Sequence, residues 1–134
     1  MEPGHVYVAQ PSQHLMVLPP GVLHLDPGPR VSFSRPAADV LFRSAAQVYG
    51  PRVIGVILTG GDGDGADGMR AIEQAGGHRI VQEPEDALNP SMPRSALKGD
   101  HPEYVVPLKD IASLLIHLIT GQAAPKSSVA SKGA

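Results

Sequence analysis

The stretch VIGVILTGGDGDGADGMRAIEQAGG, residues 53–77, decides the fold of this chain. It begins with β-branched and apolar residues on both faces, which is typical of an interior strand of a parallel sheet. A run rich in glycine and aspartate follows. Apolar residues then return at helical spacing, which predicts a helix over about residues 65–75 with Ala66, Met69 and Ile72 on one face. A strand that turns through glycines into a helix is a basic unit of α/β proteins.

Strands and helices are predicted to alternate on both sides of this segment. A short strand over residues 5–10 precedes a hairpin that turns at Pro19-Pro20-Gly21, where proline and glycine favour a tight turn. A helix is predicted from Pro36, a residue tolerated in a first helical turn, to Gly50, a typical helix end. The other predicted elements are strands over 78–84 and 103–108, and helices over 91–99 and 109–121.

This order of elements predicts the fold class. Alternation of strands and helices is typical of a parallel sheet with helices on its faces. We therefore predict an α/β fold of the doubly wound, Rossmann-like layered type, with an N-terminal β-hairpin. Residues 1–120 are expected to form one domain. Residues 121–134 are small and polar, and predict a disordered tail.

The composition fits a single globular domain and excludes several functions. Of the 134 residues, 42% are hydrophobic and 18% are charged. The formal net charge of −2 provides no basic surplus for binding nucleic acid. The absence of cysteine excludes disulfides and cysteine nucleophiles, and is compatible with the cytoplasmic location that we expect. The longest apolar stretch, IASLLIHLI, is about half as long as a membrane span, so we expect no membrane insertion.

The glycine-rich loop after the strand allows three interpretations. The first is a dinucleotide site, because residues 63–68 fit the pattern G-x-G-x-x-G between a strand and a helix. Glu83, after the next strand, could contact a ribose. However, Asp62, Asp64 and Asp67 would surround the pyrophosphate and repel it.

The second interpretation, a calcium-binding loop, fails on residue types. If Asp62 and Asp64 are the first two ligands, the next ligand position is Ala66, which has no side-chain oxygen. The position that requires glycine is then occupied by Asp67. No pair of histidines elsewhere has the spacing of metal ligands on a helix. We therefore predict no metal and no cofactor.

The third interpretation is a turn that presents one carboxylate. Functional groups of parallel α/β proteins lie at the carboxyl ends of the strands, and glycine allows the backbone to turn sharply there. Asp64 or Asp62 could orient a histidine, as the acid of a hydrolase triad does. Alternatively, Asp64 caps the following helix, with Asp67 supporting the helix dipole. The residues alone leave both possibilities open.

Four blocks of the chain, taken in order, carry motifs of one enzyme family. GHVYVAQPSQHLMV is similar to a Y-x-A-P-x-x-x-H-L-x-V hairpin, and SRPAADVLFRSAA to R-P-x-x-D-V-L-F. GVILTGGDGDGADGMRAIEQAGG is similar to L-T-G-M-x-x-D-G-A-x-G-(M/L), and NPSMPRSAL to G-M-P-R-x-A. In these blocks, from residue 3 to about 118, the chain resembles the catalytic domain of the chemotaxis protein-glutamate methylesterases.

The resemblance implies a doubly wound α/β domain with a serine, histidine and aspartate triad that hydrolyses glutamyl methyl esters on chemoreceptors. It places the triad aspartate at Asp64. It places the active-site loop, which helps to hold the oxyanion, at Thr59, Gly60 and Gly61, where Gly61 replaces the family's methionine. Met92 matches a loop that lies near the active centre in the family.

The family's nucleophile and catalytic histidine have no counterpart in this sequence. The nucleophile lies in a G-x-S-x-G-G turn and the histidine in a Q-H segment, and both precede the region that this chain resembles. His14, in SQHL, matches instead a histidine of the later hairpin that is ordinarily not catalytic. We therefore expect the chain alone to be inactive and to lack the first strand–helix–strand of the fold.

Three functions follow from these patterns. The first is a methylesterase-type ester hydrolase domain of bacterial chemotaxis, incomplete without its serine and histidine, that acts on a methylated chemoreceptor. The second is a non-catalytic binding or regulatory relative, and the third is a small nucleotide-binding domain. A sheet flank without a covering strand invites pairing, so we also expect a homo-oligomer.

Overall fold

The computed structural model describes residues 1–61, 63–98 and 103–121. In this part of the chain, β1 (His14–Leu18) and β2 (Val22–Asp26) form an antiparallel hairpin. A parallel sheet has the strand order β3 (Ile54–Ile57), β4 (His78–Gln82) and β5 (Tyr104–Val106). The helices are α1 (Ala38–Tyr49), α2 (Ala66–Gln74), α3 (Ser91–Leu97) and α4 (Leu108–Thr120), with short 3-10 turns at Gly50–Arg52 and Pro84–Asp86.

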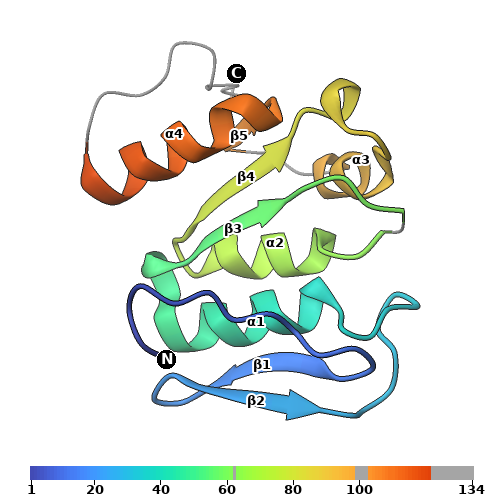
Figure 1. Cartoon of the computed structure of the whole chain (residues 1–134), viewed down its shortest axis with the longest axis vertical. Coiled ribbons are helices and arrows are strands. Elements are labelled where there is room, and N and C mark those ends of the chain that lie inside the picture. The colour runs from blue at the N-terminus through green and yellow to red at the C-terminus, as the bar shows by residue number, and fades with distance from the viewer. Residues whose placement is uncertain (62, 99–102, 122–134) are drawn as a thin grey trace.

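Helices cover both faces of the parallel sheet (Figure 1). On one face, Ile57 and Val81 pack with Ile72 of α2, in a core to which α1 and α3 also contribute. On the other face, Ile80 packs with Leu114 of α4. The hairpin packs against α1 and forms an outer layer beside it. The prediction of a layered, doubly wound α/β fold with an N-terminal hairpin is confirmed.

Local sequence signals explain where most elements end. The hairpin turns at Gly21, whose amide donates to the Leu18 carbonyl at 2.7 Å. The φ angle of Gly21 is 133°, in a region that favours glycine. Helix α1 ends at Tyr49, and the next residue, Gly50, has a φ angle of 55°. The predicted hairpin, helices and three later strands are therefore present, with ends that shift by a few residues.

Two predictions drawn from apolar patterns were wrong. Residues 5–10 form no strand, and Val6 and Val8 are 90% and 82% exposed. Alternating residues become a strand only where another strand can pair with them. The segment over residues 52–60, expected as an interior strand, contains β3, which pairs in the described chain with β4 alone. Its apolar residues on both faces reflect the helices above and below the sheet rather than strands on both sides.

Two further expectations concern residues outside the described ranges. The predicted disordered tail was residues 121–134, of which Gly121 is described as the C-cap of α4 and residues 122–134 lie outside the described ranges. Asp62 also lies outside the described residues. None of the helices in the described ranges has both the length and the apolar character needed to cross a membrane.

Candidate active site

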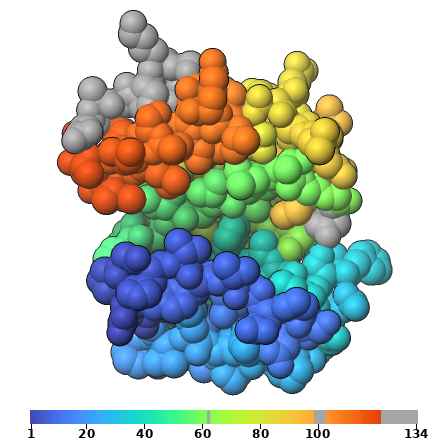
Figure 2. Space-filling view, in the orientation of Figure 1, coloured from blue at the N-terminus to red at the C-terminus, as the bar shows by residue number. Residues whose placement is uncertain are grey.

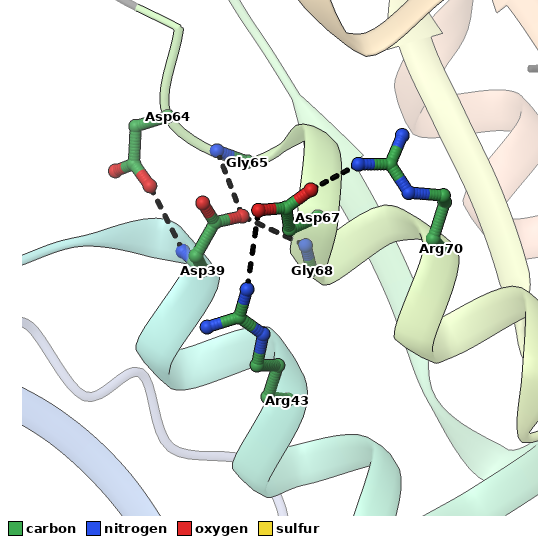
Figure 3. A network of polar contacts seen from close by, with 7 residues as sticks. All are labelled: Asp39, Arg43, Asp64, Gly65, Asp67, Gly68 and Arg70. Atoms are coloured by element: carbon green, nitrogen blue, oxygen red, sulfur yellow. Dashed lines mark hydrogen bonds and ion pairs between the residues drawn. The ribbon is translucent and has the colours of Figure 1, made fainter. Parts of the chain in front are cut away.

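Asp64 is a buried carboxylate that caps helix α1. It lies in the loop between β3 and α2, and it is 5% exposed. One carboxylate oxygen, Oδ2, accepts a hydrogen bond from the amide of Ala38 at 2.5 Å. The other, Oδ1, accepts from the amide of Asp39 at 2.9 Å (Figure 3). The N-cap residue of α1 is Ala37, whose side chain cannot accept these bonds, so Asp64 supplies the cap.

Asp39, in the first turn of α1, caps helix α2 in return. Its Oδ1 accepts from the amide of Gly65 at 3.1 Å and from the amide of Gly68 at 2.7 Å (Figure 3). The N-cap residue of α2 is Gly65, which has no side chain for this purpose. The starts of α1 and α2 are therefore joined by two carboxylates, each provided by the opposite helix start.

The carboxyl group of Asp39 is in an unfavourable electrostatic environment. The side chain is 1% exposed, and burial raises its pKa above the usual range. The hydrogen bond from Gly68 opposes this rise, whereas the negative charges of Asp64 and Asp67 add to it. The nearby guanidinium of Arg43 lowers the pKa by a smaller amount. Such a group persists in a fold when its hydrogen bonds compensate for its desolvation.

The alternative that Asp64 caps the following helix was wrong about which helix it serves. Asp64 caps α1, which precedes it in the chain, and Asp39 provides the cap of α2. Asp67 lies in the first turn of α2 with a 51% exposed side chain, where it pairs with Arg43 at 3.2 Å and with Arg70. These exposed ion pairs lie in a wide hollow between α1 and α2.

The buried ring of His14 also forms a hydrogen bond at the start of α1. The amide of Ala37 donates to Nδ1 at 3.2 Å, so Nδ1 acts as an acceptor. Nε2 then carries the proton and donates to the carbonyl of Pro29 at 2.8 Å. The ring is 2% exposed and both nitrogens are bound to backbone groups. This arrangement agrees with the expectation that His14 is not a catalytic base.

A small cavity opens beside Asp64. Its volume is about 270 Å³, and its lining is mostly apolar, with Leu15 and Leu41 among the lining residues and Asp64 as the ionisable one. The cavity borders the segment that leads into α1, including Pro36 and Ala38. A mostly apolar cavity with one fixed polar group is the usual form of a small-molecule or side-chain binding site.

The predicted active-site loop is held against the segment that precedes α3. The amide of Thr59 donates to Gln82 Oε1 at 3.0 Å, and its hydroxyl donates to the carbonyl of Asn89 at 3.0 Å. The amide of Gly60 also donates to the carbonyl of Asn89, at 2.9 Å, and the amide of Met92 donates to the carbonyl of Gly60 at 3.1 Å. The structure therefore brings Thr59, Gly60 and Met92 together.

Gly60 lies in close contact with the side chain of Met92. A Cβ atom at residue 60 would be 2.2 Å from the Met92 sulfur. The amides of Thr59 and Gly60 are both used within the protein. Gly61, the third residue of the predicted loop, is exposed.

Two residues that organise this region were missed from the sequence. Asp39 lies in the R-P-x-x-D-V-L-F block, but its contact with Gly65 spans 26 residues and has no local signal. Gln82 is 3% exposed at the end of β4, where its amide nitrogen donates to Asp86 at 2.9 Å. A polar residue that directly follows the apolar pair Ile80 and Val81 at the carboxyl end of β4 was the signal that could have identified Gln82.

The geometry of α2 also bears on the dinucleotide interpretation. A pyrophosphate would need the amides at the start of this helix. The amides of Gly65 and Gly68 instead donate to the carboxylate of Asp39, so a negative group of the chain already occupies that position. This arrangement disfavours a nucleotide site at residues 63–68.

Comparison with known proteins identifies the family. The CheB methylesterase family matches residues 1–115. A putative protein-glutamate methylesterase/protein-glutamine glutaminase of Leptospira interrogans is 46% identical over 115 residues, which cover 86% of this chain and 60% of that protein. Protein-glutamate methylesterase FrzG of Myxococcus xanthus is 42% identical over 119 residues, which cover 89% of this chain and 36% of FrzG.

A solved structure agrees with these relatives. The Thermotoga maritima CheB methylesterase catalytic domain superposes with a TM-score of 0.84 at 32% identity, over 87% of this chain and 64% of that one. The chain thus spans less than two thirds of the length of each of these proteins. Sequence and fold agree, and the chain belongs to the CheB methylesterase family.

Proposed function

We propose that this chain is part of a protein-glutamate methylesterase unit that hydrolyses glutamyl methyl esters on chemoreceptors, with Asp64 as the acid of the triad. The observation that carries the proposal is the buried Asp64 carboxylate, fixed by two amides at the edge of a mostly apolar cavity. The family and the names of the relatives support the reaction class. A cytoplasmic location is part of the proposal and is compatible with a chain that has no cysteine.

The proposed chemistry assigns Asp64 a single task. In a serine hydrolase the serine oxygen attacks the ester carbonyl and histidine accepts its proton. The acid holds the histidine in the reactive orientation and stabilises the imidazolium that forms. Asp64 is suited to this task because the bonds from Ala38 and Asp39 fix the direction of its carboxylate. If the carboxylate had to be oriented during the reaction, part of its stabilisation of the imidazolium would be lost.

We assign the oxyanion contact within the loop to the amide of Gly61. The amides of Thr59 and Gly60 already donate to Gln82 and Asn89, which anchor the loop. Gly61 replaces the family's methionine, but the backbone amide is retained. Met92 packs against Gly60.

Ser44 of α1 and His14 of the hairpin are both committed to structural hydrogen bonds. Ser44 is buried, and its hydroxyl donates to the Leu41 carbonyl and accepts from the Val17 amide. Both ring nitrogens of His14 are bound to backbone groups. The proposal therefore requires that a serine and a histidine are supplied by another polypeptide segment, and that these described residues have no turnover by themselves.

The test is methanol release from a methylated receptor peptide. The chain is assayed alone and with the segment of the Thermotoga maritima catalytic domain that has no counterpart in it. We expect no methanol above background from the chain alone, and release when the segment is added. Asp64→Asn should abolish that release, whereas the exposed control Asp67→Asn should retain it. Release by the chain alone, or release that persists in Asp64→Asn, would contradict the proposal. Ammonia release from a glutamine peptide tests the second activity named for the relatives.

A second candidate is a non-catalytic binding or regulatory role. The observation that favours it is that Ser44 and His14 are both committed to structural hydrogen bonds. In that case the chain would bind a methylated receptor fragment, measured by calorimetry, and would release no methanol in either arm of the assay. Binding that is unchanged in Asp64→Asn would support this role over catalysis.

We also propose that the chain self-associates at β3. This strand is an edge of the sheet in the described chain and contains Ile54, Gly55, Val56 and Ile57, with no charged residue or proline to block pairing. Beside it lies an apolar hollow of about 330 Å³, between the hairpin and β3. Figure 2 shows the N-terminal segment and the hairpin below the band that contains β3. Two copies can pair the same strand about a twofold axis.

Light scattering at high micromolar concentration tests this association. The wild-type chain should have at least the mass of a dimer. Leu23→Lys places a charge in the hollow and should shift the protein to a monomer. Leu25 lies in β2 together with Leu23, but it is exposed and does not line the hollow. Leu25→Lys should therefore leave the mass unchanged. A stable wild-type monomer would refute the proposal.

A further inference from the structure

Asp39 is a buried titratable residue for which the proposed reaction has no direct use. Its carboxylate is 1% exposed and accepts two amides of another helix, those of Gly65 and Gly68. Gly65 directly follows Asp64 in the chain, so the bond from its amide fixes the turn that carries Asp64. Asp39 does not border the cavity beside Asp64, so it is not placed to contact a substrate there.

The contacts between residues 39 and 64–65 form a closed ring. The amide of Asp39 donates to Asp64 Oδ1 at 2.9 Å, and the amide of Gly65 donates to Asp39 Oδ1 at 3.1 Å. One bond therefore fixes the Asp64 side chain, and the other fixes the backbone at its C-terminal side. A rotation of Asp64 must break one of these bonds or move the start of α1.

The turn itself depends on this attachment. Gly65 has a φ angle of 107°, and a Cβ atom at this residue would lie 2.3 Å from Cδ1 of Ile57. Glycine makes this close approach possible, but it also leaves the backbone with more freedom than any other residue would. The carboxylate of Asp39 restricts that freedom because it accepts hydrogen bonds from the amides of Gly65 and Gly68. Gly68 is the third residue of α2.

We propose that Asp39 is a positioning residue, which holds the Gly65–Gly68 turn so that the Asp64 carboxylate faces its cavity in one orientation. This inference rests on the proposed function, because orientation matters for catalysis only if Asp64 is the triad acid. The geometric part of the inference stands on the hydrogen bonds alone. It can therefore be tested without turnover.

Amide hydrogen exchange, measured by NMR on the full chain, provides that test. The amide of Ala38, at the start of α1, has no partner within its own helix, so its protection reports the bond to Asp64. The amide of Gly68 reports the bond to Asp39. The amide of Ile72, in the buried core, serves as the reference for global unfolding.

Asp39→Ala removes the acceptor, and Asp39→Asn keeps an oxygen in its place. In Asp39→Ala, we expect the amides of both Gly68 and Ala38 to exchange about tenfold faster or more, relative to Ile72. In Asp39→Asn, both should stay within about twofold of the wild type. Asp67→Asn removes a nearby exposed charge without touching these amides, and should change neither.

Two results would overturn the proposal. If Gly68 loses protection in Asp39→Ala while Ala38 keeps it, Asp39 caps α2 and has no influence on Asp64. If Asp39→Ala does not fold, Asp39→Asn decides, and loss of protection at either amide in that variant counts against the proposal.

The methanol assay with the added segment connects the geometry to catalysis. We expect Asp39→Ala to lower kcat about tenfold with little change in KM, and Asp39→Asn to restore most of it. A purely structural role would not produce this split between kcat and KM. If Asp64→Asn retains methanol release, the proposed function fails, and the exchange data still decide whether Asp39 positions Asp64.

Discussion

Removal of the Asp64 carboxylate should destabilise the fold even where no catalysis is involved. Asp64→Ala leaves the amides of Ala38 and Asp39 at the start of α1 without their acceptor. Loss of a helix cap typically costs about 0.5–2 kcal/mol, and each buried donor left unpaired costs about 1–3 kcal/mol. Because the two estimates describe the same bonds, we expect a total loss of about 2–4 kcal/mol. That is a large part of the ~5–15 kcal/mol that stabilises a typical domain.

Asp64→Asn provides a graded comparison. Its single side-chain oxygen can serve one of the two amides, while its NH2 group faces the other donor. The expected loss is therefore about 1–2 kcal/mol, about half that of alanine. The control Asp67→Asn removes a carboxylate in the first turn of α2, close in sequence to Asp64, whose side chain is 51% exposed. This variant should change the free energy of unfolding by less than about 1 kcal/mol.

Urea unfolding at neutral pH, followed by circular dichroism because the chain has no tryptophan, measures these differences. All variants must be compared at one protein concentration, because self-association would contribute to the apparent stability. The reasoning is refuted if Asp64→Ala loses less than about 0.5 kcal/mol, since a cap on two buried amides cannot then be present. A loss in Asp67→Asn as large as that in Asp64→Ala would also refute it.

Three further outcomes follow from the same region. His14→Ala removes the acceptor for the Ala37 amide from a site that is 2% exposed, and should lower the free energy of unfolding by about 2–4 kcal/mol in urea titrations. Burial raises the pKa of Asp39, so the native state binds its proton more tightly than the unfolded state does. The contribution of Asp39 to the free energy of unfolding therefore falls as the pH rises from its unfolded pKa of about 4 through its raised folded pKa. Over that pH range, unfolding curves should show the stability of Asp39→Asn increasing relative to the wild type. Gly65→Ala should lower the free energy of unfolding by about 2–4 kcal/mol, because φ is 107° and the added Cβ would overlap a core side chain. The control Gly121→Ala, where φ is 77° and the space is open, should lower it by about 1 kcal/mol in the same assay.

Much of the candidate site could be predicted from motifs, but its hydrogen bonds could not. The motifs placed Thr59, Gly60 and Met92 in one region, and the structure joins these residues through backbone bonds. One of the two alternatives that the residues left open made Asp64 the cap of the following helix, because capping is usually read from neighbouring residues. The actual partner, the start of α1, lies 25 residues earlier in the chain. No local pattern contains that information.

The sequence by itself determined the types and the order of the elements from residue 14 onward, but not the absence of a strand over residues 5–10. Apolar spacing identified β3 and α2, and proline and glycine marked the hairpin turn and the end of α1, because these signals act within a few residues. Tertiary structure decided which strand lies at an edge and which carboxylate caps which helix. The apolar residues of a strand indicate only that its faces are covered. The amides of a helix start donate to whichever acceptor packs against them. For this reason, the pairing of Asp39 with α2 and of Asp64 with α1 became visible only in the folded chain.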